Sequence, residues 1–216
     1  TSPQAVACAT ECMILFNTSS NLYVYNFTAN TSTQITIPGF FESDDIAHYW
    51  DPNANGGIGE GRIWIYGNQG SGTQFFREFR ISSLCPFTID TTYNNGVGFK
   101  NIPFPFSPPM FVGNGLTYVE TTGGQYVLIG SITGPNIIPN KMVKFFINST
   151  ASPYTSSYAE LFEISSSITT PDVVYGDIIV TNNSAAGGQK VIFSKYDPSP
   201  PGSLYLTQFD YAGLYY

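Results

Sequence analysis

Short runs of apolar and aromatic residues, separated by polar turns, follow one another along almost the whole chain. β-Branched and aromatic residues fill runs of about five to eight residues, which Gly, Pro, Asn and Ser cut apart. No long stretch has apolar residues at the three- and four-residue spacing of an amphipathic helix. The pattern therefore predicts an all-β protein with strands within residues 13–16, 22–27, 34–37, 45–50, 62–66, 74–81, 87–90, 116–119, 126–129, 142–147, 159–164, 177–181, 191–194 and 204–211.

Four of these runs end in a similar three-residue pattern, in which two large apolar residues flank a middle residue that is usually polar. The four occurrences are Tyr25-Asn26-Phe27, Phe79-Arg80-Ile81, Phe145-Phe146-Ile147 and Phe209-Asp210-Tyr211. They recur at intervals of about 60 residues, a length that suits one small sheet in a stack of repeats. The sequence therefore predicts a single all-β repeat domain over 1–216, with approximate repeats 1–40, 41–102, 103–168 and 169–216.

The predicted architecture is a β-propeller of about four blades. The last repeat has three predicted strands, so residues 4–9 are expected to supply its fourth strand and close the ring. Such closure hides sheet edges that otherwise invite aggregation. Two alternatives fit the same strands: a β-sandwich or jelly roll, and an open partial propeller completed by another subunit.

Two local patterns sharpen this picture. Gly123-Gly124 predicts a two-residue hairpin between the strands in 116–119 and 126–129. Residues 22–27 are apolar or aromatic at both odd and even positions, which predicts a strand that is covered on both faces.

Charged residues are scarce. They make up 11% of the 216 residues, and the formal net charge is −7, whereas an average soluble domain has roughly 25% charged residues. The eight Lys and Arg do not cluster, which argues against nucleic acid as a partner, because cationic contacts with phosphates dominate that binding. No apolar stretch approaches the ~20 residues of a membrane-spanning helix, so no membrane insertion is expected. Richness in Asn, Thr, Ser, Gly and Gln favours an extracellular or virion-surface protein.

The ends and the cysteines give weaker information. The chain begins with Thr1 and shows no signal segment, which predicts a processed chain or a fragment. Cys8 could pair with Cys12, or Cys85 could pair with either of them, and the odd count leaves at least one thiol unpaired. The alternative is three buried, unpaired cysteines.

The most specific local motif runs from Asp51 to Arg62. Oxygen-bearing side chains at its first, third and fifth positions, followed by glycine, match the opening of a calcium loop: Asp51, Asn53 and Asn55. Its twelfth position is Arg62, where calcium loops carry a bidentate glutamate, so Glu60 would have to substitute. The metal-site hypothesis is therefore calcium held by Asp51, Asn53, Asn55 and Glu60, and the alternative is a metal-free Asn/Gly hairpin loop.

Candidate catalytic residues are few. His48 is the only histidine, and because nothing marks a serine nucleophile for it, we expect a hydrogen-bonded strand histidine. Paired carboxylates can cleave glycosides, but Glu160 and Glu163 are three residues apart in one predicted strand and so point to opposite faces. Asp44 and Asp45, which are also alternative ligands for the calcium loop, would likewise point apart. The sequence therefore predicts no enzyme, no catalytic residue, and no cofactor other than calcium.

Tyrosines offer candidate contact surfaces, since an exposed ring beside amide side chains suits sugars or a protein partner. Those that are predicted in loops or at the end of the chain are Tyr93, Tyr154, Tyr158, Tyr196, Tyr215 and Tyr216.

Several segments taken together resemble propeller-like repeats of bacteriophage and large-virus proteins, many of them virion components. These segments are residues 43–48, 62–67, 76–81 and 206–211. The resemblance covers most of the chain in outline and is sharpest in the second repeat and the last strand. It implies a structural or attachment role on a virus particle, and it brings no catalytic pattern.

The leading hypothesis is thus a non-enzymatic virion structural or surface-appendage protein that mediates subunit contacts or host-surface attachment. Its expected partners are other virion structural proteins and a host glycan or surface receptor, in an oligomeric assembly at the virion surface or outside the cell. Two alternatives remain: a secreted, lectin-like adhesion module, and a propeller enzyme that acts on polysaccharide.

Overall fold

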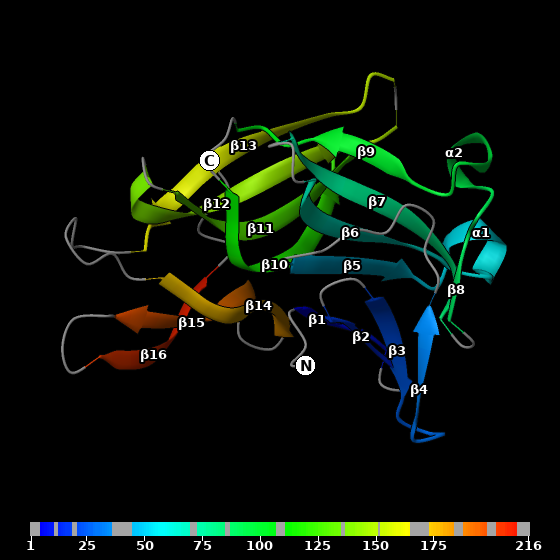
Figure 1. Cartoon of the computed structure of the whole chain (residues 1–216), viewed down its shortest axis with the longest axis horizontal. Helices are drawn as coiled ribbons and strands as arrows, with labels where there is room; N and C mark the ends of the chain where they lie inside the picture. The colour runs from blue at the N-terminus through cyan, green and yellow to red at the C-terminus, as the bar shows by residue number, and fades with distance from the viewer. Residues whose placement is uncertain are drawn as a thin grey trace. The chain divides into compact units, whose positions relative to one another are not determined.

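The computed structural model confirms the all-β class, with two four-residue helical turns beside the strands (Figure 1). It describes residues 5–10, 13–18, 21–35, 45–69, 73–84, 87–106, 111–134, 137–150, 152–164, 173–183, 188–197 and 202–210. The chain divides into two compact units, Thr1–Phe104 with Ser149–Thr155, and Pro105–Asn148 with Ser156–Tyr216. In the described residues, no helix is both long and apolar enough to cross a membrane.

The first sheet is a four-stranded antiparallel meander in the order β1-β2-β3-β4. Its strands are β1 (Ala5–Thr10), β2 (Met13–Thr18), β3 (Asn21–Asn26) and β4 (Thr31–Ile35). The prediction that residues 4–9 complete the last sheet is wrong, because β1 pairs with β2, with Val6 opposite Phe16. The two-residue link between these strands makes a local hairpin the cheaper choice, since closing a short loop costs less chain entropy.

The second sheet has five strands, in the order β5-β6-β7-β8, with β9 also paired to β7. Its strands are β5 (Asp45–Asp51), β6 (Glu60–Gln69), β7 (Thr73–Leu84), β8 (Phe87–Ile89) and β9 (Lys100–Pro103). Strands β8 and β9 pair with different stretches of the twelve-residue β7. Two helical turns join the strands: α1 (Ala54–Gly57) between β5 and β6, and α2 (Tyr93–Gly96) between β8 and β9. Strand β9 and both turns were not predicted from the sequence.

These two sheets share one hydrophobic core within the first unit. Leu22 and Val24 of β3 belong to the same buried cluster as Ile63 of β6 and Phe79 of β7. Because side chains alternate along a strand, Tyr23 lies on the other face of β3, where it is half-buried. The expectation that β3 is covered on both faces therefore holds fully for one face only.

The second unit contains two further antiparallel meanders, β10-β11-β12-β13 and β14-β15-β16. Their strands are β10 (Phe111–Thr122), β11 (Gln125–Gly134), β12 (Ile137–Asn148), β13 (Thr155–Glu163), β14 (Val173–Asn183), β15 (Gly188–Asp197) and β16 (Ser203–Asp210). The hairpin predicted at Gly123-Gly124 is confirmed, and both glycines have positive φ, +55° and +76°, as a tight hairpin turn requires. Met142 of β12 and Phe193 of β15 share this unit's core.

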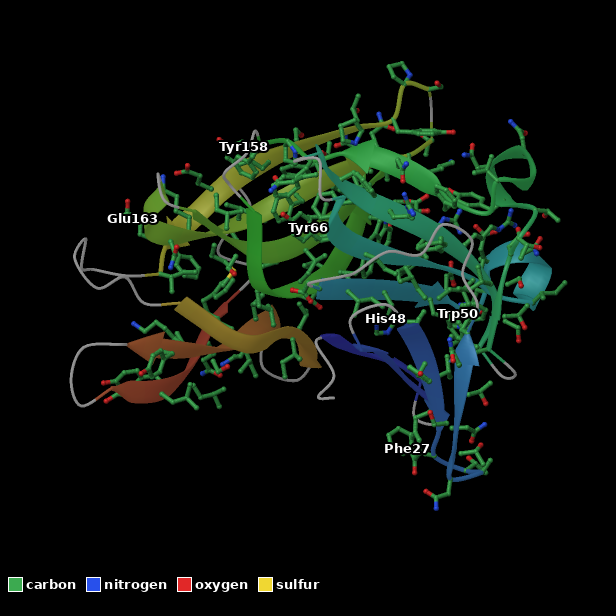
Figure 2. The ribbon with its side chains drawn as sticks, in the orientation of Figure 1. Phe27, His48, Trp50, Tyr66, Tyr158 and Glu163 are labelled. Carbon is green, nitrogen blue, oxygen red and sulfur yellow. The ribbon has the colours of Figure 1, made fainter. Side chains whose placement is uncertain are left out.

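The repeated three-residue pattern has a common place in all four sheets. It begins on the third strand each time, at Tyr25 of β3, Phe79 of β7, Phe145 of β12 and Phe209 of β16. Phe79 and Phe145 are fully buried, because a strand in this position fills the core on one side of its sheet. The pattern ends beyond the strand in the first sheet, where Phe27 lies in the turn to β4 (Figure 2). Three of the sheets lie within the predicted ranges 1–40, 103–168 and 169–216, and the second extends one residue beyond 41–102, to Pro103 of β9. In the described residues none of the sheets closes on itself.

Candidate functional site

Two loops at one end of the second sheet repeat the same sequence pattern and the same backbone path. Both read Asp, three residues, Asn, one residue, Gly, an aliphatic residue and Gly, over 51–59 and 90–98. The asparagines at their fifth positions have φ of +53° at Asn55 and +55° at Asn94, in the left-handed region that Asn tolerates better than most residues. We call 51–59 and 90–98 the twin loops.

Matching hydrogen bonds hold the twin loops in shape. The Oδ1 of Asp51 accepts the N–H of Asn53, and the Oδ1 of Asp90 accepts the N–H of Thr92, both at 2.9 Å. Each loop then closes through its last glycine, where Gly59 donates to the Ala54 carbonyl at 3.0 Å and Gly98 donates to the Tyr93 carbonyl at 2.7 Å. An aspartate that caps its own turn is a local device that needs no partner from elsewhere in the chain.

The loops carry their aliphatic residues outward. Ile58 is 73% exposed and Val97 is 49% exposed. The glycine after each has positive φ, and at Gly59 a side chain is also sterically excluded, because an added Cβ would stand 2.2 Å from the ring of Trp50. The backbone of the first loop thus packs against Trp50 at Gly59, while Ile58 beside it is exposed.

Arg80 of β7 ties the twin loops together. Its Nη2 lies 2.8 Å from Oε2 of Glu60, which follows the first loop, and its Nη1 lies 3.7 Å from Oδ2 of Asp90, which opens the second. Figure 1 shows α1 and α2 at the same end of this sheet. Hydrogen bonds from Thr92 lower the pKa of Asp90, with Arg80 adding to the effect, so this carboxylate stays ionised.

A buried carboxylate, Glu78, lies on the same face of β7 as Arg80, because the two residues are two positions apart in the strand. Strand register places it opposite Trp64, whose Nε1–H donates to Glu78 Oε2 at 2.8 Å. The hydroxyl of Tyr93, in α2, donates to Oε1. The Nε of Arg62 is 3.7 Å from the same oxygen, and Nη1 of Arg62 is 2.5 Å from Glu60. Alternate residues of β6 and β7 therefore form a continuous ionic network beneath the loops.

Lys100 of β9 links this network to a segment distant in sequence. Its Nζ lies 4.7 Å from the ring centroid of Tyr93 and 4.8 Å from that of Tyr154, and it donates to the Ser149 carbonyl at 2.6 Å. Burial lowers the pKa of Lys100, and the Glu78 charge acts in the opposite direction. The Tyr154 hydroxyl also donates to Asn94 at 2.8 Å, so the second of the twin loops is held from both sides.

The four predicted calcium ligands do not form a set of free donors. Asp51 caps its own turn, and Glu60 carries two guanidinium partners, Arg62 and Arg80, whose positive charges compete with any cation. Within the described residues no group of three or more His, Cys, Asp or Glu side chains could hold a metal. The first of the twin loops is thus stabilised by internal partners, and calcium binding there stays a prediction.

The other candidates are dispersed. His48 lies on β5 opposite Ile63, and burial lowers its pKa to about 4, which keeps it neutral at pH 7 (Figure 2). Both oxygens of Glu160 accept from Lys141 Nζ, at 2.9 and 2.8 Å, whereas Glu163 is separately exposed on β13. Asp45 is buried and accepts the N–H of Ile46.

Several other expectations concern tyrosines and residues outside the described ranges. Tyr158 and Tyr196 are exposed as expected, whereas Tyr93 is buried against Glu78 and Tyr154 is half-buried. Five residues named in the sequence analysis lie outside the described ranges: Asp44, Tyr215, Tyr216, Cys12 and Cys85. The cysteine pairing is therefore among the predictions that stay open.

Sequence reasoning missed the second of the twin loops and the Glu78 network. A signal for the loop was present, since its Asp, Asn and two Gly recur at the same spacing as in the first. For Glu78 no signal was available, because its partners on β6 and α2 come close to it only after the sheet has formed.

No family model matches the chain, and no curated protein matches it either. The fold and the site define the class: an all-β protein of successive antiparallel meanders, one of which presents two loops of the same conformation over a buried ionic network.

Proposed function

We propose that the chain is a non-enzymatic virion structural or surface-appendage protein, and that its twin loops contact a neighbouring virion protein or a host surface. The observation that carries the proposal is the pairing of two apolar, outward-facing loop tips, Ile58 and Val97, with a fixed ionic base. Loops that are already ordered lose little conformational entropy when they bind a partner.

The carboxylates at this site support a structural role in preference to a catalytic one. A general acid or base must come within hydrogen-bond reach of a substrate. Glu78 is fully buried beneath Trp64 and Tyr93, and Glu60 is held by two arginines. These side chains stabilise the loops, and their ionic partners already occupy their oxygens.

We propose further that the sheets are the blades of a four-bladed β-propeller. In a propeller, each blade is a meander of about four strands, and the first strands of neighbouring blades adjoin. Within the first unit β1 contacts β5, and within the second β10 contacts β14, where Gly115 packs against Ile178. Each of these contacts joins the first strands of two successive meanders. A propeller needs such contacts between neighbouring blades, whereas a β-sandwich does not.

The nature of the contact follows from the composition of the loops. Their exposed residues are all uncharged (Pro, Thr, Asn, Gly, Ile and Val), and the chain has a net charge of −7. Such a surface suits a protein or a neutral glycan better than a polyanion.

The first test is peptide mass spectrometry of purified virus particles, together with a glycan array probed with the purified chain. We expect the chain in the particles, and we expect the double variant Ile58→Asp, Val97→Asp to weaken particle incorporation or surface attachment by about tenfold or more. Ile179→Asp, which changes an exposed aliphatic residue of the second unit, is the matched control and should leave both unchanged.

Other results would favour the alternatives. Glycan binding by a chain that is absent from particles would indicate the lectin-like adhesion module. Release of reducing sugar from a polysaccharide, abolished by combined substitution of Asp44, Asp45 and Glu60, would indicate the enzyme. Either outcome would overturn the proposal of a virion component without chemistry of its own.

A further inference from the structure

In the described residues the last sheet has three strands, whereas the other sheets have four, five and four. In each of the first three sheets a fourth strand lies beside the third: β4 beside β3, β8 beside β7, and β13 beside β12. Strand β16 holds the third place in its own sheet and carries the same three-residue pattern at Phe209. Within the described residues, its only strand neighbour is β15.

Strand β16 is also far more exposed than its counterparts. Leu206 is 79% exposed, Leu204 is 61% exposed and Tyr205 is 49% exposed. Because side chains alternate across a strand, these three residues show apolar surface on both faces of the sheet. Phe79 of β7 and Phe145 of β12, by contrast, are completely buried.

The outer edge of β16 lacks the usual features that protect a sheet edge. Natural edge strands carry inward charges, prolines or bulges that prevent pairing with other chains. Strand β16 reads Ser-Leu-Tyr-Leu-Thr-Gln-Phe-Asp, and its only charged residue is the terminal Asp210. Its register with β15 is unbroken from Ser203 to Asp210. The edge strand β13, in comparison, carries Glu160 and Glu163.

We propose that β16 pairs antiparallel with β16 of a second copy of this chain, across a two-fold axis. An axis perpendicular to the sheet keeps each side chain on its own face, so odd residues must pair with odd ones and even with even. Centred on Leu206, the register sets Leu206 against Leu206, Leu204 against Gln208, and Tyr205 against Thr207. The most exposed apolar side chain then lies on the axis.

Charge and length also favour a second copy as the occupant. In this register Asp210 faces Gly202, so the two aspartates lie at opposite ends and no like charges oppose each other. The two copies contribute strands of equal length, and their three-stranded sheets join into one of six strands, within the usual size range. The dimer would supply a subunit contact of the kind that the proposed function expects, yet it does not depend on the twin loops.

The test begins with the mass of the chain in solution. Sedimentation at about 50 µM is expected to give a dimer, and Leu206→Lys, which sets two ammonium groups against each other on the axis, should weaken it at least tenfold. Because Leu206 is exposed, this variant should keep the wild-type circular dichroism spectrum and melting temperature at low concentration. The matched control, Ile179→Lys, changes an exposed aliphatic residue of β14, outside both β16 and the twin loops, and should remain dimeric.

Cross-linking then tests the register. In a background with Cys8, Cys12 and Cys85 changed to alanine, Leu206→Cys should form a disulfide-linked dimer on non-reducing electrophoresis. Leu204→Cys should not, because the two copies of that residue would be about 13 Å apart, too far for a disulfide.

Three results would overturn the inference: a monomer at this concentration, a dimer that Leu206→Lys leaves intact, or Leu204→Cys cross-linking as readily as Leu206→Cys. The first two would exclude β16 as the interface, and the third would exclude the proposed register. None of them bears on whether the chain is present in virus particles, so the two proposals fail separately.

Discussion

The second and fourth sheets carry the same three-residue pattern on their third strands, but they differ in how far those strands are buried and covered. In the second sheet, Phe79 is buried, β8 and β9 cover the outer edge of β7, and Glu78 and Arg80 join strands and loops into one network. In the fourth, Phe209 is only half-buried, and β16 exposes leucine and tyrosine. The same strand pattern is therefore compatible with a sheet that is complete in itself and with one that leaves an edge for a partner.

The difference also shows what each sheet contributes. Buried ion pairs seldom add net stability over an apolar core, but they fix a single arrangement of the groups they join. In the second sheet they hold the twin loops at a fixed spacing. The fourth sheet has exposed apolar side chains in place of such a network. They contribute favourable free energy only when a partner buries them.

Removing the buried carboxylate should have the largest effect on this comparison. Glu78→Ala removes the acceptor of the Trp64 N–H and of the Tyr93 hydroxyl and one of the two carboxylates beside Arg62. It should lower the free energy of unfolding by about 3–5 kcal/mol. Urea denaturation measures the loss. Glu160→Ala, which removes an exposed ion pair with Lys141, is the control and should cost less than about 1 kcal/mol. Equal losses would show that Glu78 is not the centre of the network.

The same truncation in the two third strands should give unequal losses. Phe79→Ala empties a fully buried site and should cost about 3–5 kcal/mol. Phe209 contacts Phe162 and Phe193 at its ring edge and remains partly exposed, so Phe209→Ala should cost about half as much or less. Denaturation of both variants at low chain concentration checks the ratio. A larger loss for Phe209→Ala would mean that the last sheet is the better packed of the two.

Two glycine substitutions separate strain from steric clash within the first of the twin loops. Gly57 and Gly59 both have φ of +89°, but an added Cβ meets nothing within 4 Å at Gly57 and stands against the Trp50 ring at Gly59. Gly59→Ala should therefore cost about 1–3 kcal/mol more than Gly57→Ala. Thermal unfolding of the two variants measures the difference. Indistinguishable melting temperatures would show that the loop does not rest on Trp50.

Much of the strand framework could be predicted, because it depends on local alternation. Runs such as 62–66 and 142–147 are dense in β-branched and aromatic residues, and Gly123-Gly124 dictates its own turn. The spacing of the Phe79, Phe145 and Phe209 patterns follows the spacing of the sheets, because each pattern begins on the third strand of its sheet.

The partners of particular strands and side chains could not be predicted in the same way. The sequence of residues 5–10 fits either end of a sheet, and the choice of β2 depends on loop length. Glu60 was predicted as a metal ligand, and its guanidinium partners include Arg80, twenty residues away. Such pairings depend on strand register, which sequence alternation leaves free by steps of two residues.

The most direct test of the contrast between the sheets is amide hydrogen exchange on β7 and β16 as the chain concentration rises. This contrast predicts that amides of β7 exchange slowly at every concentration, whereas those on the outer edge of β16 exchange fast in dilute solution and become protected as the dimer forms. Protection of the β16 edge that is complete even at the lowest concentration, or absent at the highest, would contradict it.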